Sequence, residues 1–208
     1  MIELNYAGKS TFLNLPPDKQ ALILREAVRE FGDYGYRQAS VNRIVARTGI
    51  AKGSLYQYFA NKEALFLYVF GCFAELVKQT VREAAGQGGE GDFYTKMGQV
   101  MRAGEDFVAN HPDYFRLYLK LAGDAEIPHR GELLGRLRLF PGEYFAPLLV
   151  QGQRDGLIRN DVGLTALLFL IEGVIERFLQ GLAGSAKPAA NLVAELMVLL
   201  RGGLAPTR

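Results

Sequence analysis

The sequence predicts an all-α protein, with a small basic bundle of three helices at the front, a larger apolar helical domain behind it, and about nine helices in total. Three observations support this prediction. Apolar residues recur at spacings of three and four along nearly the whole chain, which is the period of an amphipathic helix. No alternating strand pattern of useful length interrupts them. A glycine-rich segment at residues 86–91 separates the two parts.

The first predicted helix follows the pair Pro16-Pro17, which suits a first helical turn, and we expect it to end at Gly35. Its apolar residues at helical spacing are Leu24, Ala27, Val28 and Phe31.

Two short helices joined by a turn come next. Ser40 is a favourable N-cap for a helix that ends at Gly49, a residue that can adopt the left-handed conformation of a tight turn. A third helix is expected over residues 51–59, with Leu55 and Phe59 facing inwards.

The long fourth helix begins after Asn61, a second expected cap. The glycine-rich segment that follows it is read as a loop and not as a phosphate cradle, because no strand precedes it and no Gly-Lys-Ser/Thr follows. The apolar stripe of this helix is Leu65, Val69, Phe73, Leu76 and Val77.

Five further helices are predicted in the rear part, and we expect Pro141 and Pro147 to interrupt the third of them. Their ranges are 93–110, 112–121, 131–154, 162–182 and 188–200.

Composition sets outer limits on function. The chain has 208 residues, of which 49% are hydrophobic and 22% are charged, enough to bury a real core. No run is expected to cross a membrane, because the most apolar stretch, residues 165–175, is broken by Glu172 and Glu176. The N-terminus has no apolar signal core, so we expect a cytoplasmic protein.

Cysteine and histidine are scarce. Cys72 is the single cysteine, which excludes an internal disulfide, and His111 and His129 are far apart in sequence. We therefore expect no metal site and no cofactor. No nucleophile with a plausible base, and no nucleotide-binding loop, supports an enzyme.

Positive charge is concentrated at the front. Residues 1–62 hold 9 Lys and Arg against 5 Asp and Glu, whereas the remainder holds 15 against 17. No carboxylate occurs between Tyr34 and Lys62. A solvated face normally mixes signs, so this stretch indicates a polyanionic partner. Its five cations are Arg37, Arg43, Arg47, Lys52 and Lys62.

The two short helices form a candidate helix-turn-helix. Ile44, Ile50 and Leu55 are spaced to pack the angle between them, so the second helix would lie in the major groove of DNA. Lys52 adds positive charge at its start. Groups that could reach phosphates and base edges are offered by Ser54, Tyr56, Gln57 and Tyr58.

The segment SVNRIVARTGIAKGSLYQYFANKEAL, residues 40–65, together with AVREFGDYGY, residues 27–36, resembles the DNA-binding domain of the TetR (tetracycline-repressor) family of bacterial transcription regulators. The resemblance covers roughly the first 70 residues. Val45 and Thr48 stand where that family usually has alanine, and Ala51 replaces the usual serine or threonine. The loss at Ala51 of a cap and phosphate contact would shift affinity towards Lys52 and the arginines.

The resemblance implies a helix-turn-helix DNA-binding domain over residues 1–60 and an effector-binding and dimerisation domain over residues 61–208. It implies that Ser40 and Lys62 bind phosphates, and that Gln57 and Tyr58 read or clamp the groove. The full set of expected DNA-binding residues is Ser40, Arg43, Ala51, Lys52, Gly53, Ser54, Tyr56, Gln57, Tyr58 and Lys62.

By the same resemblance the expected partners are a palindromic operator in double-stranded DNA, a second copy of the chain through the last two long helices, and a small apolar or amphipathic effector. Residues expected to line the effector site are Met97, Met101, Phe115, Tyr118, Tyr144, Phe145, Phe169, Glu172 and Glu176. For each aromatic residue, simple core packing is the favoured alternative.

Two questions stay open at this point. Glu172 and Glu176 lie on one face of an apolar helix, where they could form ion pairs, a polar rim at a dimer interface, or a counter-charge for a cationic ligand. The protein could also keep its helix-turn-helix as an interaction module, or act as an activator without a small-molecule effector.

Overall fold

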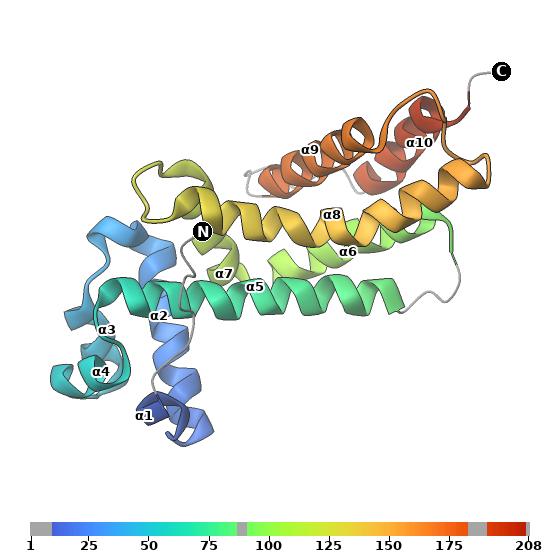
Figure 1. The fold of residues 1–208 in the computed structure, drawn as a ribbon. Helices are drawn as coiled ribbons and strands as arrows, with labels where there is room; N and C mark the ends of the chain where they lie inside the picture. The colour runs from blue at the N-terminus through green and yellow to red at the C-terminus, as the bar shows by residue number, and fades with distance from the viewer. Residues whose placement is uncertain (1–9, 87–90, 183–190, 207–208) are drawn as a thin grey trace. The chain divides into compact units, whose positions relative to one another are not determined.

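The computed structural model describes residues 10–86, 91–182 and 191–206. Within these ranges it contains ten α-helices and no strand (Figure 1), which confirms the all-α prediction. The helices are α1 (Ser10–Leu13), α2 (Pro17–Gln38), α3 (Val41–Thr48), α4 (Lys52–Tyr58), α5 (Lys62–Gly86), α6 (Phe93–Asn110), α7 (Pro112–Gly123), α8 (Arg130–Arg154), α9 (Leu164–Leu182) and α10 (Leu192–Leu204).

Most predicted boundaries agree with these helices to within a few residues. The short helix α1 was missed, because four residues are too few to show a helical period. The predicted start of the last helix at Pro188, and residues 87–90 of the glycine-rich segment, lie outside the described residues.

The chain divides into two compact units. The first contains residues 1–76 and 111–134, and the second contains residues 77–110 and 135–208. The first unit therefore includes α7, which packs along α2, as well as the helices of the predicted DNA-binding domain. The functional boundary expected after residue 60 stays a prediction.

The core of the first unit forms where α2 meets its neighbours. Ile23, Ala27 and Phe31 are fully buried along the inner face of α2. The helical conformation ends at Gly35, where φ is +70°, a value that glycine adopts without steric cost. The predicted helix end at Gly35 is thus confirmed in the backbone, although a further turn of residues follows it.

Gly32 lets α2 and α7 approach closely. A Cβ atom at this position would lie 3.1 Å from the Asp113 backbone oxygen and 3.4 Å from the Leu117 backbone nitrogen. Both are main-chain atoms of α7, so a side chain could be accommodated only by moving one helix against the other.

We expect Gly32→Ala to lower the free energy of unfolding by about 1–3 kcal/mol, the usual cost of overpacking, despite the better helix propensity of alanine. Gly135→Ala in α8 is the matched control, because nothing lies within 4 Å of its Cβ position. That variant should gain about 0.5–1 kcal/mol. Chemical denaturation of both variants measures the difference, and a Gly32→Ala protein as stable as Gly135→Ala would contradict the close α2–α7 contact.

Helix α5 has the composition of a membrane span, which the sequence prediction did not recognise. An 18-residue window of it has a mean hydropathy of 1.4, and 39% of that window is buried inside the fold. The buried helix of a protein core has the same composition. Leu65, Val69, Phe70 and Phe73 of α5 are at most 3% exposed. Packing within the fold therefore accounts for much of the apolar content of this helix.

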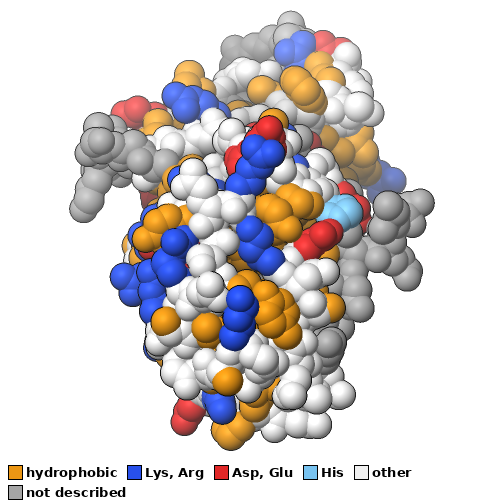
Figure 2. Space-filling model, turned by 90° about the vertical axis from the view of Figure 1, so that its left-hand side faces the viewer, with side chains coloured by type: hydrophobic (Ala, Val, Ile, Leu, Met, Phe, Trp, Pro, Cys, Tyr) orange, Lys and Arg blue, Asp and Glu red, His pale blue; other side chains and the backbone are white. Residues whose placement is uncertain are grey.

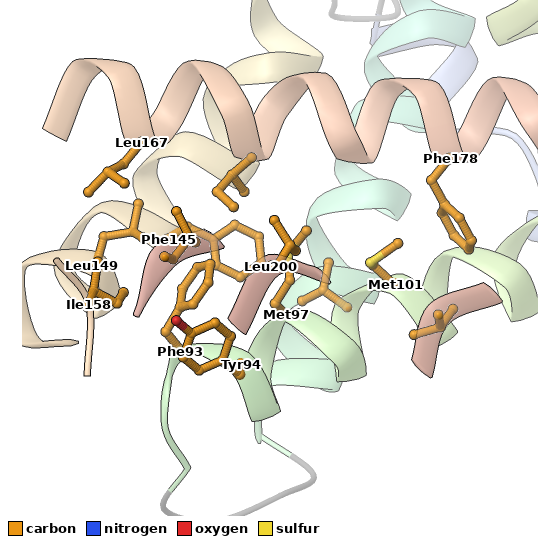
Figure 3. Packing of buried hydrophobic residues seen from close by; sticks show 14 of the residues in the cluster. Phe93, Tyr94, Met97, Met101, Phe145, Leu149, Ile158, Leu167, Phe178 and Leu200 are labelled. Atoms are coloured by element: carbon orange, nitrogen blue, oxygen red, sulfur yellow. The ribbon is translucent and has the colours of Figure 1, made fainter. Parts of the chain in front are cut away.

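The second unit has its own core, built from α6, α8, α9 and α10 (Figure 3). Met97 and Phe145 are fully buried at its centre, and Phe93 lies edge-on to Phe145 with ring centroids 5.8 Å apart. Leu167 of α9 and Leu200 of α10 close the cluster.

The predicted interruption of α8 was wrong. This helix continues from Arg130 to Arg154 through both Pro141 and Pro147. A proline inside a helix removes one backbone hydrogen bond and strains the preceding turn, but packing on either side can hold the helix together. Phe145 and Leu149, both fully buried, provide that packing.

Candidate nucleic-acid interface

Helices α3 and α4 form the predicted helix-turn-helix. Gly49 joins them with φ of +68°, the left-handed conformation that was expected of it. Ile44 and Leu55 are buried in the angle between the helices, and Ile50 is half-buried beside them. The three apolar residues predicted to fix the angle therefore do so.

The outer surface of α4 carries most of the predicted contact residues. Figure 2 shows the side of the molecule on which α3 and α4 lie, where Lys and Arg side chains are interspersed with hydrophobic ones. Lys52, Gly53 and Gln57 are exposed, Ser54 is half-buried, and Tyr56 is 41% exposed. Ala51, immediately before α4, is also exposed and provides no side-chain cap.

Tyr58 is not on that surface. It is 9% exposed and faces the interior, with its ring centroid 6.0 Å from that of Phe12. Because α4 turns through about 100° per residue, a helix that exposes Gln57 directs the next residue elsewhere. The expectation that Tyr58 reads or clamps the groove has no support from its position.

Phe12 of α1 is the residue that sequence reasoning missed. It is 1% exposed, and its ring centroid lies 4.9 Å from Phe59 and 5.2 Å from Tyr68. The Thr11 hydroxyl donates a hydrogen bond of 2.9 Å to the Gln57 carbonyl at the end of α4. Helix α1 therefore fastens the C-terminal end of α4 to α5. The one signal in the sequence is the apolar pair Phe12-Leu13 before the two prolines.

Ser40 occupies the N-cap position of α3, as predicted, but its hydroxyl makes no capping hydrogen bond. Its backbone N–H donates instead to the Glu30 carboxylate at 2.8 Å. The backbone just before α3 is thus tied to α2 through a buried acid.

Glu30 is completely buried and binds two arginines of α3. The Arg43 Nε donates to Glu30 Oε1 at 2.8 Å, and the Arg47 Nη1 donates to Glu30 Oε2 at 3.2 Å. The Arg43 Nη2 also donates to the Gln38 carbonyl, and the guanidinium lies 4.1 Å from the centroid of the Tyr34 ring. The bond to Glu30 raises the pKa of the Arg43 guanidinium.

Lys62 also has partners inside the protein. Its Nζ donates to the carbonyl oxygens of Arg37 and Ala39, at 3.1 and 3.3 Å, and lies 4.8 Å from the centroid of the Tyr36 ring. This places the ammonium group at the end of α2, where a cation satisfies terminal carbonyls. The phosphate contact implied for Lys62 would compete with these interactions.

Most cations of the basic stretch are engaged within the protein, so less positive charge is available to a partner than the sequence indicates. Arg37 pairs with Glu126, Arg43 and Arg47 share Glu30, and Lys62 holds backbone carbonyls. In the part of the chain that the structure describes, Lys52 is the cation of this stretch that makes no hydrogen bond or ion pair. Acids distant in sequence compensate charges that appeared unpaired.

The buried hydroxyl of Thr48 and the thiol of Cys72 are each accounted for by their surroundings. The Thr48 hydroxyl donates to the Ile44 carbonyl at 3.0 Å, so a buried hydroxyl in a position usual for alanine costs little. Burial raises the pKa of the Cys72 thiol, which keeps the thiol protonated and unreactive. No group of three or more metal-ligating side chains occurs among the residues whose placement is described.

The predicted effector residues are divided between the two units. Met97, Met101 and Phe145 are buried together in the core of the second unit, and Tyr144 packs against them. Phe115 and Tyr118 belong to α7 in the first unit, and Phe169 is 80% exposed on α9.

Glu172 and Glu176 are half-buried on α9. Glu176 accepts a hydrogen bond of 3.5 Å from Gln180, one turn further along the helix. A Cβ atom on Gly142 of α8 would lie 3.2 Å from Glu172 Oε1, so this carboxylate lies directly against α8.

An exposed apolar surface runs along α9 and α10. Phe169 and Leu170 of α9 are 80% and 44% exposed, and Val198 and Leu199 of α10 are 72% and 70% exposed. Large apolar side chains grouped in this way typically mark an interface.

A left-handed glycine turn, a buried apolar angle and an exposed second helix together define the helix-turn-helix class of proteins. Residues 23–69 match the family described as bacterial regulatory proteins of the tetR family. This match assigns the DNA-binding domain of the chain to the TetR family of transcriptional regulators.

Similar proteins extend the match over more of the chain. A TetR family transcriptional regulator from Chloroflexus aurantiacus is 28% identical, with 94% of this chain and 90% of that chain covered and a TM-score of 0.66. The probable acrEF/envCD operon repressor of Escherichia coli is 21% identical over 170 residues, 78% of this chain and 76% of that protein. The transcriptional regulator FadR from Bacillus subtilis, solved in complex with stearoyl-CoA, is 19% identical and has a TM-score of 0.70, covering 87% of this chain and 96% of that one.

Two further matches cover about a third of this chain. The fatty acid metabolism regulator protein of Bacillus subtilis is 34% identical over 71 residues, which is 32% of this chain. This match spans 37% of the length of that protein. The match to a second Bacillus subtilis regulator, YhgD, spans 35% of its length. The chain therefore covers about a third of the length of these two relatives.

Proposed function

We propose that this protein is a ligand-responsive DNA-binding regulator of transcription in the cytoplasm, which binds a palindromic operator as a homodimer and represses the adjacent genes. The observation that carries the proposal is the position of α4. Lys52 and Gln57 are exposed on its outer surface, and the buried side chains of Ile44 and Leu55 hold α4 against α3. A second helix held in this way enters the major groove in helix-turn-helix proteins. Two related proteins are described as repressors.

The dimer would form through the apolar surface of α9 and α10. Phe169, Val198 and Leu199 are each at least 70% exposed, and a second copy would remove them from water. Two-fold symmetry in the protein would match two-fold symmetry in the operator.

The effector would be an apolar or amphipathic small molecule bound within the second unit. Its core offers methionine side chains, Met97 and Met101, which adapt readily to new partners, beside Phe145. FadR is described in complex with stearoyl-CoA, and a matched relative is named as a fatty acid metabolism regulator, so long-chain acyl-CoA is the first compound to test.

Substitutions in α4 separate positioning from base reading. Lys52→Ala should weaken binding to every duplex and reduce the slope of log affinity against log salt by about 0.9 per bound subunit, because one phosphate contact is lost. Gln57→Ala should also relax the base preference, by about 1–3 kcal/mol per lost contact. Titrations with operator and scrambled duplexes over a range of salt concentrations measure both effects. Equal losses on the two duplexes for Gln57→Ala would remove this residue from base readout.

The effector prediction is tested by operator affinity in the presence of acyl-CoA compounds, lipophilic cations and neutral aromatics. A weakening of about 100-fold requires the ligand to favour the released state by about 2.7 kcal/mol. A binder that acts through the proposed core should lose its effect in Met101→Ala and keep it in Leu157→Ala, since Leu157 is exposed and lies outside that core. If no compound weakens the operator complex, the ligand-responsive part of the proposal fails.

An interaction module that uses the helix-turn-helix without DNA, or an activator without an effector, is the competing function. Sequence-specific binding that weakens with salt separates the regulator from the interaction module. Transcription from an operator-linked reporter, in cells with and without the protein, then separates a repressor from an activator.

A further inference from the structure

A fully buried carboxylate lies directly beneath the candidate DNA-binding surface. Glu30 is 0% exposed, whereas the side chains of its partners Arg43 and Arg47 are 42% and 30% exposed. The two arginine side chains of α3 therefore bind a buried carboxylate while they remain partly exposed to solvent. A buried carboxylate is tolerated only when charged donors satisfy it, and Arg43 and Arg47 are the charged donors that do so here.

The hydrogen bonds show how strongly the arginines are engaged. Arg43 directs Nε and Nη2 to Glu30 and also shares Nη2 with the Gln38 carbonyl. Arg47 directs Nη1 to the other oxygen of Glu30. Donors that point inwards to a carboxylate are not available to a phosphate outside, and the carboxylate reduces the net charge of the cluster from +2 to +1.

We propose that Glu30 is a specificity-determining residue, which limits binding to any DNA sequence by withholding the Arg43 and Arg47 guanidinium groups from phosphates. The inference rests on the proposed DNA-binding function. Phosphate contacts supply affinity without sequence information, and base contacts supply the discrimination. A protein that withholds cations beside α4 binds random DNA more weakly. The base contact of Gln57 then supplies a larger share of the total binding free energy.

The proposal makes a quantitative expectation for Glu30→Gln. This variant retains an oxygen that accepts the Ser40 N–H and removes the charge that holds the arginines. The guanidinium groups of Arg43 and Arg47 then both become available to phosphates, so the salt slope should become steeper by up to about 1.8 per bound subunit. Affinity for random-sequence duplex at low salt should rise accordingly.

Three further variants of the full chain are the controls. Glu30→Asp keeps the charge and should keep the wild-type slope even where it lowers the melting temperature. Arg47→Gln removes a withheld cation and leaves Arg43 on Glu30, so its slope should also stay near the wild-type value. Lys52→Gln removes a cation that makes no hydrogen bond or ion pair among the described residues, and it should lower the slope by about 0.9 per bound subunit.

The measurement is the salt dependence of binding to a random-sequence duplex, with elution from immobilised heparin as a second polyanion that has no bases. Steeper slope and later heparin elution for Glu30→Gln, with a wild-type slope for Glu30→Asp, establish the proposal. An unchanged or shallower slope for a folded Glu30→Gln overturns it. If circular dichroism shows that Glu30→Gln is unfolded, Arg47→Gln decides: a slope reduced as much as in Lys52→Gln overturns the proposal, and an unchanged slope supports it.

Failure of the proposed DNA-binding function and failure of the proposed role of Glu30 give different results. A wild-type protein that binds heparin but no duplex contradicts the proposed function, and the heparin elution of the variants still decides the role of Glu30. A wild-type protein that binds duplex, with Glu30→Gln unchanged on both polyanions, leaves the function standing and removes the inference.

Discussion

Phe12→Ala is expected to lower the free energy of unfolding of the first unit by about 3–5 kcal/mol, the usual cost of removing a buried phenylalanine. Phe12 is 1% exposed and contacts three aromatic rings, those of Tyr58, Phe59 and Tyr68. These rings come from α4, from the turn after it and from α5. The substitution therefore removes the contact by which α1 holds α4 in place.

DNA affinity should fall together with stability in this variant, because α4 loses its support at the end opposite Lys52. The neighbouring Leu13→Ala is the matched control: Leu13 is 54% exposed, so its loss should change stability by no more than about 0.5 kcal/mol. Urea denaturation and operator titration of both variants make the comparison. Equal stability of the two variants would mean that α1 contributes nothing to the fold of the helix-turn-helix.

The second large effect is expected at the exposed surface of α9 and α10. Val198→Asp combined with Leu199→Asp places two charges where the proposed dimer buries apolar side chains, and should convert the protein to a monomer. A monomer binds one half-site and loses the avidity of two linked DNA-binding domains. Operator affinity should therefore fall by about 10²–10⁴-fold.

Leu157→Asp is the control for this substitution, since Leu157 is a 41% exposed leucine that belongs to neither α9 nor α10. Light scattering after size exclusion gives the mass of each variant, and operator titration gives the affinity. A double variant that stays dimeric with undiminished operator affinity would place the dimer interface elsewhere.

The sequence predicted the helices well because their determinants are local. Gly35 and Gly49 end helices through backbone conformations that glycine favours, and the Asn61 side chain caps α5 by accepting the Ala64 N–H at 2.8 Å. The inner residues of the helix-turn-helix, Ile44 and Leu55, were identified from spacing alone and are buried.

The features that were missed depend on residues far apart in sequence. Glu30 lies 13 and 17 residues from the arginines that it binds, and Arg37 pairs with Glu126, so a charge count along the chain overestimated the free positive charge. Phe12 lies 46 residues before Tyr58, and a four-residue helix gives no period to detect.

The effector residues were the least predictable for the same reason. Spacing along a helix identifies an apolar face, but it does not tell which neighbour covers that face. Phe145 is covered by the core of the second unit, whereas Phe169, on the more apolar helix α9, is left exposed. The continuous α8 also shows that tertiary packing can outweigh the local effect of Pro141 and Pro147.

Selection of bound duplexes from a random pool tests the central proposal most directly. The helix-turn-helix and the proposed dimer predict an enriched inverted repeat, with half-site centres about 34–36 Å apart, one turn of DNA, or at a larger spacing in register with the helix. Enrichment of that palindrome by the wild-type protein, and its loss with Gln57→Ala, is the expected result. A pool that stays random, or enriched sites without inverted symmetry, would contradict the assignment of this protein as a dimeric operator-binding regulator.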